Sequence, residues 1–291
     1  MYLGSFLRSL FTPRKFLSAI YFLMNIALIF LLFGWLSLFD FGTELDFLWN
    51  GLVGLGIHLV ILLVSLSPVG EAITRFQMGA KKETDERALK LFQEVYERAG
   101  GHSSRLSRHV KLYRIQRNEI NAFALGHRTV IGLDGLMSCS DAQIRAVLAH
   151  EFGHIANGDS DITLGIRVAN SILTVFLFIY TLIVNLIAVV VGILSESVGD
   201  IVRIVLLWVV NFVYSLWVGL GYLMDNASSR KQEYAADAFA VSCGYGAELH
   251  AFLSALDPSP QKMSLFSLMS STHPDTVRRL QRIEKNIEPA A

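Results

Sequence analysis

The residues best suited to chemistry are two histidines and a glutamate in the run His150-Glu151-Phe152-Gly153-His154. Residues four apart lie on the same face of a helix, so both imidazoles can reach a single metal ion. Glu151 would sit beside that ion without binding it, where its carboxylate can take a proton from water. The pattern indicates a metal-dependent peptidase that holds one zinc ion per chain.

A helix with clear ends is expected to carry this motif. Ser140, with Gln143 three residues later, forms the capping-box pattern that begins helices. Asn157-Gly158 is a favourable stop, because glycine readily takes the left-handed conformation found at helix ends.

Catalytic zinc takes three protein ligands and leaves one position open, so a third ligand is required. A third histidine six residues after the second is one known arrangement, but position 160 is Ser160. The remaining option is a distant acid, and Glu233 and Asp237 have helical i, i+4 spacing. Glu233 could bind the ion while Asp237 accepts the second N–H of a liganding histidine. A solvated helix face is the alternative interpretation of these two acids.

The chain contains four apolar runs, and each reaches or exceeds the roughly 20 residues that a helix needs to cross a bilayer. They cover residues 17–39, 47–67, 168–194 and 201–223. Lys and Arg gather before the first run, after the second and after the fourth, which predicts both termini on the cytoplasmic side. Two crossings lie between His154 and Glu233, so the chain returns to the same side and the two can meet.

The predicted architecture is a mainly α membrane protein with four transmembrane helices and a zincin-like cytosolic α+β catalytic domain. The expected divisions are a cytosolic segment, a transmembrane hairpin, the first catalytic part, a second hairpin and the second catalytic part. Their bounds are residues 1–16, 17–69, 70–167, 168–224 and 225–291. In the catalytic part we expect a helix over residues 84–99, stopped by Gly100-Gly101, and short strands over residues 110–113, 121–125 and 129–133.

The first fifteen residues are expected to form an amphipathic segment on the membrane surface, with apolar side chains facing lipid. We expect no nucleic-acid partner, because 25 basic and 25 acidic residues leave no net positive charge to attract one. The lipid-facing side chains would be Phe6, Leu7, Leu10 and Phe11.

Several short motifs of this chain resemble motifs of a single known family. They are Asn121-Ala122-Phe123, His150 to His154, Ala156-Asn157-Gly158-Asp159, Ser229-Arg230, Glu233-Tyr234, Ala236-Asp237, Thr272-His273-Pro274 and Arg279. In this order the chain resembles the HtpX-type membrane zinc metallopeptidases, relatives of the CAAX prenyl endopeptidases. The resemblance spans most of the chain from Thr84 onward.

The resemblance implies a set of roles. Zinc would be held by His150, His154 and Glu233, with Glu151 as general base and acid. Residues Asn121, Ala122 and Phe123 would form an edge strand that pairs with the substrate backbone, and His273 and Arg279 would steady the oxyanion or the peptide. Asp159 is equally well explained as a group supporting the metal ligands and as a helix-end residue. Such proteins cleave misfolded or damaged membrane proteins at the cytoplasmic face of the bacterial inner membrane.

Two other functions remain open on the sequence. One is a catalytically silent membrane scaffold or holdase that keeps a structural zinc, although structural sites are usually closed by four protein ligands. The other is a CAAX-type processing endopeptidase, whose relatives have more membrane helices than the four counted in this chain.

Overall fold

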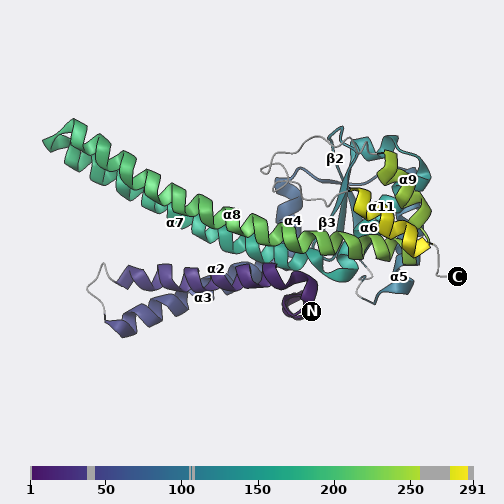
Figure 1. Ribbon diagram of the computed structural model, residues 1–291, viewed down its shortest axis with the longest axis horizontal. Coiled ribbons are helices and arrows are strands. Elements are labelled where there is room, and N and C mark those ends of the chain that lie inside the picture. Colours follow the sequence, from purple (N-terminus) through teal and green to yellow (C-terminus); the bar gives the residue numbers. More distant parts are fainter. Residues whose placement is uncertain (1, 38–42, 105, 107–108, 256–275, 288–291) are drawn as a thin grey trace. The chain divides into compact units, whose positions relative to one another are not determined.

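The computed structural model describes residues 2–37, 43–104, 106, 109–255 and 276–287. The chain divides into two compact units (Figure 1). The first unit is made of Met1–Ala19, Leu63–Leu164 and Asn226–Ala291, and the second of Ile20–Leu62 and Gly165–Asp225.

The first unit contains a mixed sheet of four short strands in the order β1-β2-β4-β3. The strands are β1 (Lys81–Lys82), β2 (Lys111–Ile115), β3 (Ala122–Leu125) and β4 (Thr129–Leu133). Strand β2 pairs parallel with β4, whereas β3 pairs antiparallel with β4 and places Phe123 opposite Ile131. Strand β3 therefore forms one edge of the sheet, with no further strand paired to its outer side among the described residues.

Helices pack on this sheet and supply most of the core of the first unit. Phe92 and Tyr96 of α5 contact Phe152 of α6, with ring centroids 5.3 and 5.6 Å from that ring. The described residues of this unit include the helices α1 (Tyr2–Leu10), α4 (Pro68–Gln77), α5 (Glu86–His102), α6 (Asp141–Asn157), α9 (Gly246–Ala255) and α11 (Thr276–Ile287). The described part of this unit also contains the 3-10 turns Pro13–Lys15 and Asp134–Ser138.

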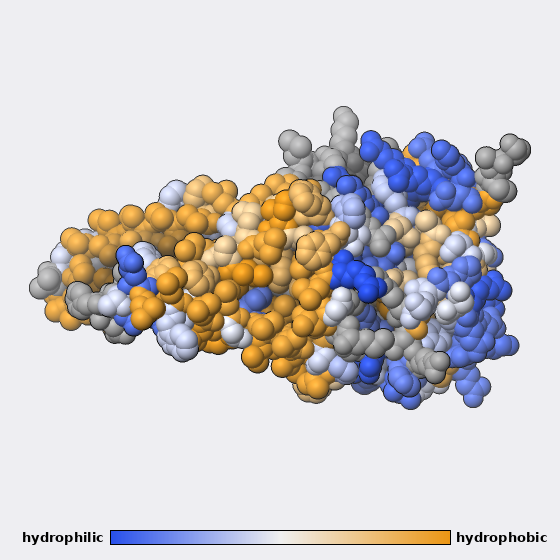
Figure 2. All heavy atoms as spheres, turned by 90° about the horizontal axis from the view of Figure 1, so that it is seen from below, coloured by the Kyte–Doolittle hydropathy of each residue, from blue (hydrophilic) through white to orange (hydrophobic). Residues whose placement is uncertain are grey.

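The second unit is built from four long apolar helices. They are α2 (Phe16–Trp35), α3 (Glu44–Ser65), α7 (Asp159–Leu194) and α8 (Glu196–Ser242), and each has a stretch long and apolar enough to cross a membrane. The ends of these helices belong to the first unit, which includes residues 226–242 of α8. Figure 2 shows hydrophobic side chains gathered over these helices, whereas hydrophilic ones predominate on the first unit. Exposed apolar side chains are expected where lipid is the solvent.

Small residues and polar side chains join the helices of the second unit. Gly51 and Gly54 of α3 lie against the rings of Phe30 and Phe33, where an added Cβ would collide. The indole N–H of Trp217 in α8 donates to the side-chain oxygen of Asn25 in α2, at 3.1 Å. Close packing at glycine and interhelical hydrogen bonds are the usual sources of helix association in membranes.

The predicted fold class is confirmed: the chain is mainly helical, with four candidate membrane helices and a small sheet. Three details differ from expectation. Helix α5 continues through Gly100-Gly101 to His102, the sheet gains a fourth strand at Lys81–Lys82, and Phe6 is buried inside the protein instead of facing lipid. Packing of Val95 and Ala99 in the core outweighs the helix-weakening effect of two glycines.

Helix α6 has both of the ends that its sequence indicates. The Ser140 hydroxyl accepts from the Gln143 N–H while the Gln143 side chain accepts from the Ser140 N–H. Gly158 ends the helix in the left-handed conformation, with φ 65°.

Replacing Ser140 by Ala should lower the free energy of unfolding by about 1 kcal/mol, because one backbone donor of α6 loses its acceptor. Thermal or SDS-titrated unfolding in detergent micelles measures the effect. Ser254→Ala is the matched control, because Ser254 is exposed within α9 and away from its start. Equal effects of the two substitutions would show that the cap does not stabilise α6.

Candidate metal centre

Helix α6 brings its two motif histidines to one point. The Nε2 atoms of His150 and His154 lie 3.2 Å apart, as the i, i+4 spacing predicts. Ligand atoms of His150, Glu151 and His154 all lie within 4.8 Å of one another. Because His150 and Glu151 are buried, these groups face the protein interior and not bulk water.

Glu233 of α8 completes a triangle of possible ligand atoms. Its Oε2 lies 3.4 Å from His150 Nε2, and its Oε1 lies 3.4 Å from His154 Nε2. Tetrahedral zinc with bonds near 2.05 Å separates neighbouring ligand atoms by about 3.3 Å. The two imidazoles and the carboxylate therefore fit a zinc ion in both chemistry and spacing.

The triangle exists because α6 and α8 touch at a glycine. A Cβ added to Gly153 would lie 2.8 Å from Ala236 Cα and 3.2 Å from Ala236 Cβ. Real side chains do not approach backbone atoms this closely, so only glycine fits at this position. The close approach brings Glu233 and Asp237, which flank Ala236, to the histidines of α6.

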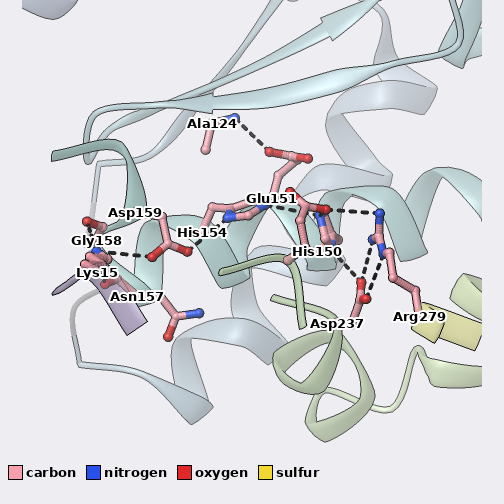
Figure 3. Close-up of polar contacts among 11 residues, drawn as sticks. Lys15, Ala124, His150, Glu151, His154, Asn157, Gly158, Asp159, Asp237 and Arg279 are labelled. Carbon is pink, nitrogen blue, oxygen red and sulfur yellow. Dashed lines mark hydrogen bonds and ion pairs between the residues drawn. The ribbon is translucent and has the colours of Figure 1, made fainter. Parts of the chain in front are cut away.

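Each histidine has a carboxylate against its other nitrogen (Figure 3). His150 Nδ1 lies 3.0 Å from Asp237 Oδ1, and His154 Nδ1 lies 3.0 Å from Asp159 Oδ2. Such contacts hold the Nδ1 proton and leave Nε2 as the lone-pair donor toward the centre.

Arg279 of α11 is buried against the same acids. Its Nε and one terminal nitrogen donate to the two oxygens of Asp237 at 2.8 and 2.6 Å. Its other terminal nitrogen lies 3.0 Å from Glu233 Oε2. The guanidinium thus supports two acids of the centre, whereas the family resemblance implied contact with the oxyanion or the peptide.

Glu151 is attached to the edge strand. Its Oε2 accepts the N–H of Ala124 in β3 at 2.8 Å. Burial raises the pKa of the Glu151 carboxyl, although the nearby histidines and the Ala124 N–H oppose this effect. A carboxyl with a raised pKa is a better proton acceptor than an ordinary glutamate at neutral pH.

The surrounding acids give the centre a strong preference for positive charge. Burial lowers the pKa of His154, but Asp159 and Glu233 outweigh it and raise the pKa well above the ordinary value. Asp237 and Glu233 raise the pKa of His150 in the same way. A divalent cation would supply the positive charge that these acids favour.

Comparison with known protein families matches residues 83–287 to peptidase family M48. The chain belongs to this family.

The M48 assignment agrees with two curated relatives. The chain is 29% identical over 186 residues to the protease HtpX homolog of Bacillus licheniformis, an alignment that covers 57% of this chain and 60% of that protein. It is 24% identical over 295 residues to protease HtpX of Pseudoalteromonas atlantica, covering 89% and 94% of the two chains. The chain thus spans about three fifths of the length of the Bacillus relative.

Among solved structures, the crystal structure of S. mikatae Ste24p aligns with 89% of this chain and 61% of its own. The identity is 20% and the TM-score is 0.47. The predicted resemblance to HtpX-type metallopeptidases is confirmed by the family and by the curated relatives. With four candidate spans, this member of the M48 family is a multi-pass membrane protein.

The other residues named from sequence are distributed as follows. Ala122 and Phe123 lie in β3, and Asn121 precedes it with its side-chain oxygen accepting the Ala122 N–H at 2.8 Å. His273 lies in residues 256–275, outside the described part of the chain.

Sequence reasoning missed two contacts of the centre. The Ala124 N–H carries no side-chain signal, so its bond to Glu151 could not be predicted. Lys15 is fully buried, and its Nζ lies 3.1 Å from Asp159 Oδ1. In the sequence it is one of several basic residues before an apolar run, a pattern that indicates only membrane orientation.

Gly153→Val should prevent the approach of α8 and sharply reduce the zinc bound per chain, at a stability cost of about 1–3 kcal/mol. Gly153→Ala should have a smaller effect of the same sign. Metal content after purification and thermal unfolding are the measurements.

Gly100→Ala is the matched control, because among the described residues nothing lies within 4 Å of its added Cβ. Full zinc content in Gly153→Val would contradict the role of this contact.

Proposed function

We propose that this M48 protein is a zinc-dependent endopeptidase that cleaves misfolded or damaged membrane proteins. The observation that carries the proposal is the meeting of His150 Nε2 and His154 Nε2, 3.2 Å apart, with the Glu233 carboxylate, whose two oxygens each lie 3.4 Å from one of these nitrogens. A buried Glu151 stands beside it. Three ligands and an adjacent carboxylate suit a catalytic site, because structural zinc usually has four protein ligands.

His150, His154 and Glu233 would hold the zinc. When bound, the ion would polarise the scissile carbonyl and lower the pKa of a coordinated water. Glu151 takes a proton from the attacking water and passes it to the leaving amine nitrogen. Its burial and raised pKa favour both halves of this transfer.

Strand β3 is proposed to bind the substrate backbone. The Leu133 N–H of β4 donates to the Asn121 carbonyl, so alternate residues Ala122 and Ala124 direct their N–H groups to the open edge. These two donors are occupied by the Asn121 side chain and by Glu151. A peptide strand pairing here would take over these bonds and lie directly beside the general base.

The supporting groups are proposed to hold the ligands in place. Asp237 and Asp159 orient the two imidazoles, and Arg279 holds Asp237 and Glu233. His273 remains a proposed donor to the oxyanion or the peptide.

The cellular setting is proposed from charge and family. Basic residues flank the apolar runs on the side that carries the metal motif, which supports a cytoplasmic location for the centre and both termini. Backbone pairing along β3 reads little side-chain identity. Broad cleavage of unfolded segments at the inner membrane, as membrane protein quality control requires, suits such a site.

Glu151→Gln should keep zinc and reduce peptidase activity by roughly a thousandfold, because the amide cannot accept the proton. Glu233→Gln should weaken zinc affinity by at least about a hundredfold. Zinc content by elemental analysis and casein cleavage in detergent measure the two effects.

Glu97→Gln is the control, because Glu97 is an exposed glutamate on α5. If the protein were a scaffold with a structural zinc, the Glu151→Gln substitution would not change its activity. Unchanged cleavage in that variant would therefore overturn the peptidase proposal.

A further inference from the structure

Helix α4 carries an apolar face that the protein leaves open. Val69, Ile73 and Phe76 are 60%, 48% and 87% exposed. Their i, i+4, i+7 spacing puts them on one side of the helix. The opposite side holds Glu71, which is only 3% exposed. This helix therefore buries its charge and exposes its apolar residues, the reverse of a helix on a water-soluble protein.

The buried side of α4 holds the turn between β3 and β4. Glu71 Oε1 accepts the His127 N–H at 2.9 Å, and Glu71 Oε2 accepts the Thr129 hydroxyl at 3.0 Å. Gly126, with φ 59°, lies so close to the Glu71 carboxylate that a Cβ would collide. One side chain thus attaches α4 to the turn that follows β3, the strand proposed to bind substrate, and to the first residue of β4.

The chain itself indicates what covers the apolar face. The membrane-spanning stretch of α3 ends at Ser65, and α4 begins at Pro68. Three residues reach at most about 10 Å, and each headgroup layer is roughly 5–8 Å thick. The start of α4 therefore lies in the headgroup layer or within a few ångströms of it. Lys81 and Lys82, exposed after α4, suit anionic headgroups.

We propose that α4 lies in the lipid–water interface, with Val69, Ile73 and Phe76 in the bilayer surface and Glu71 holding the β3–β4 turn above it. The occupant of the exposed face is lipid. Resting on the proposed function, this placement fixes β3 at a short height above the membrane. It selects peptide segments that emerge from the bilayer close to their last membrane-embedded residue.

Depth measurement tests the placement independently of activity. Phe76→Cys, in a chain whose natural cysteines are replaced (Cys139→Ser, Cys243→Ala), is labelled with an environment-sensitive dye. The protein is reconstituted in vesicles of phosphatidylethanolamine and phosphatidylglycerol. Lipid-attached quenchers should quench this dye strongly. Lys90→Cys on α5 is the control, because Lys90 is exposed and Figure 1 draws α4 and α5 on opposite sides of the strands.

Two results would overturn the proposal. One is that aqueous iodide quenches both dyes equally and the lipid-attached quenchers quench neither, which would place α4 in water. The other is efficient disulfide cross-linking between unlabelled Phe76→Cys chains, which would make the face a contact between two copies. Neither readout depends on zinc or on cleavage, so both distinguish this proposal from the proposed function.

Cleavage then tests the height of β3. Replacing Val69, Ile73 and Phe76 together by Ser should slow cleavage of a membrane-anchored substrate by at least about fivefold, since interfacial anchoring is lost. Cleavage of a soluble peptide should be unchanged. Equal slowing of both substrates, or of neither, would contradict the coupling between α4 and substrate choice.

A second observation stands independently and concerns Lys15. This lysine is 0% exposed, although burial of an ammonium group is costly without partners. Its Nζ donates to the carbonyls of Asn157 and Gly158, at the end of α6, and pairs with Asp159 at 3.1 Å. Asp159 in turn contacts His154 Nδ1.

We infer that Lys15 is a positioning residue for His154, acting through Asp159. With the ammonium on one carboxylate oxygen, the other oxygen faces the imidazole (Figure 3). Lys15 directly precedes α2 (Phe16–Trp35), so the first membrane helix begins at a support of the metal centre. This inference rests on His154 being the zinc ligand proposed above.

Zinc affinity is the decisive readout. Lys15→Met should weaken the zinc Kd by roughly tenfold, as loss of groups behind a metal ligand does, and should change the visible spectrum of the cobalt-substituted protein. Lys90→Met, at an exposed lysine, should change neither. Asp159→Asn should weaken affinity similarly, and the double variant should be no weaker than either single one.

The outcomes separate the possibilities. A lower unfolding temperature of zinc-free Lys15→Met protein with an unchanged zinc Kd would show a merely structural role and overturn the inference. Additive losses of zinc affinity in the double variant would contradict action through Asp159. Lys15→Arg keeps the positive charge and should therefore retain part of the zinc affinity that Lys15→Met loses. Failure of the unmodified protein to bind zinc would refute the proposed function instead.

Discussion

The close contact between α6 and α8 at Gly153 is the constraint on which the metal centre depends. The histidines come from α6 and the carboxylate from α8, and two membrane-spanning stretches separate them in sequence. Their donor atoms can meet within 3.4 Å only because Gly153 and Ala236 let the two backbones approach. A larger residue at Gly153 would push α8 away and carry both Glu233 and Asp237 with it. A single clash would therefore separate both acids from the histidines.

Charge balance is the second condition that the centre must meet. Glu151, Asp159, Glu233 and Asp237 are all buried, and buried charges are costly unless they are paired. Arg279 and Lys15 each contact members of this group from a different part of the chain. The raised pKa values of His150 and His154 indicate that these two cations leave the centre short of positive charge. A metal ion would supply it, and metal binding and folding of this region would then depend on each other.

Local patterns predicted the parts of the centre that local physics determines. The spacing of His150 and His154 and the cap at Ser140 are properties of a single helix, and the structure has them. Glu233 could be singled out because an even number of crossings returns the chain to one side. The partners of Arg279 and Lys15 could not, because salt bridges between distant segments have no sequence period. Helix α5 passes Gly100-Gly101 because core packing, which a local pattern does not report, exceeds the cost of two glycines.

The occupied donors on the open edge of β3 have a further consequence. In the structure Asn121 and Glu151 already satisfy the outward N–H groups of Ala122 and Ala124. An incoming chain gains little from replacing one of these bonds, and it must stay extended across both residues to replace the pair. A loop that curves within those residues could not do so, whereas an extended segment of an unfolded chain could. Discrimination between native and damaged proteins would then follow from backbone shape alone, without recognition of any particular amino acid.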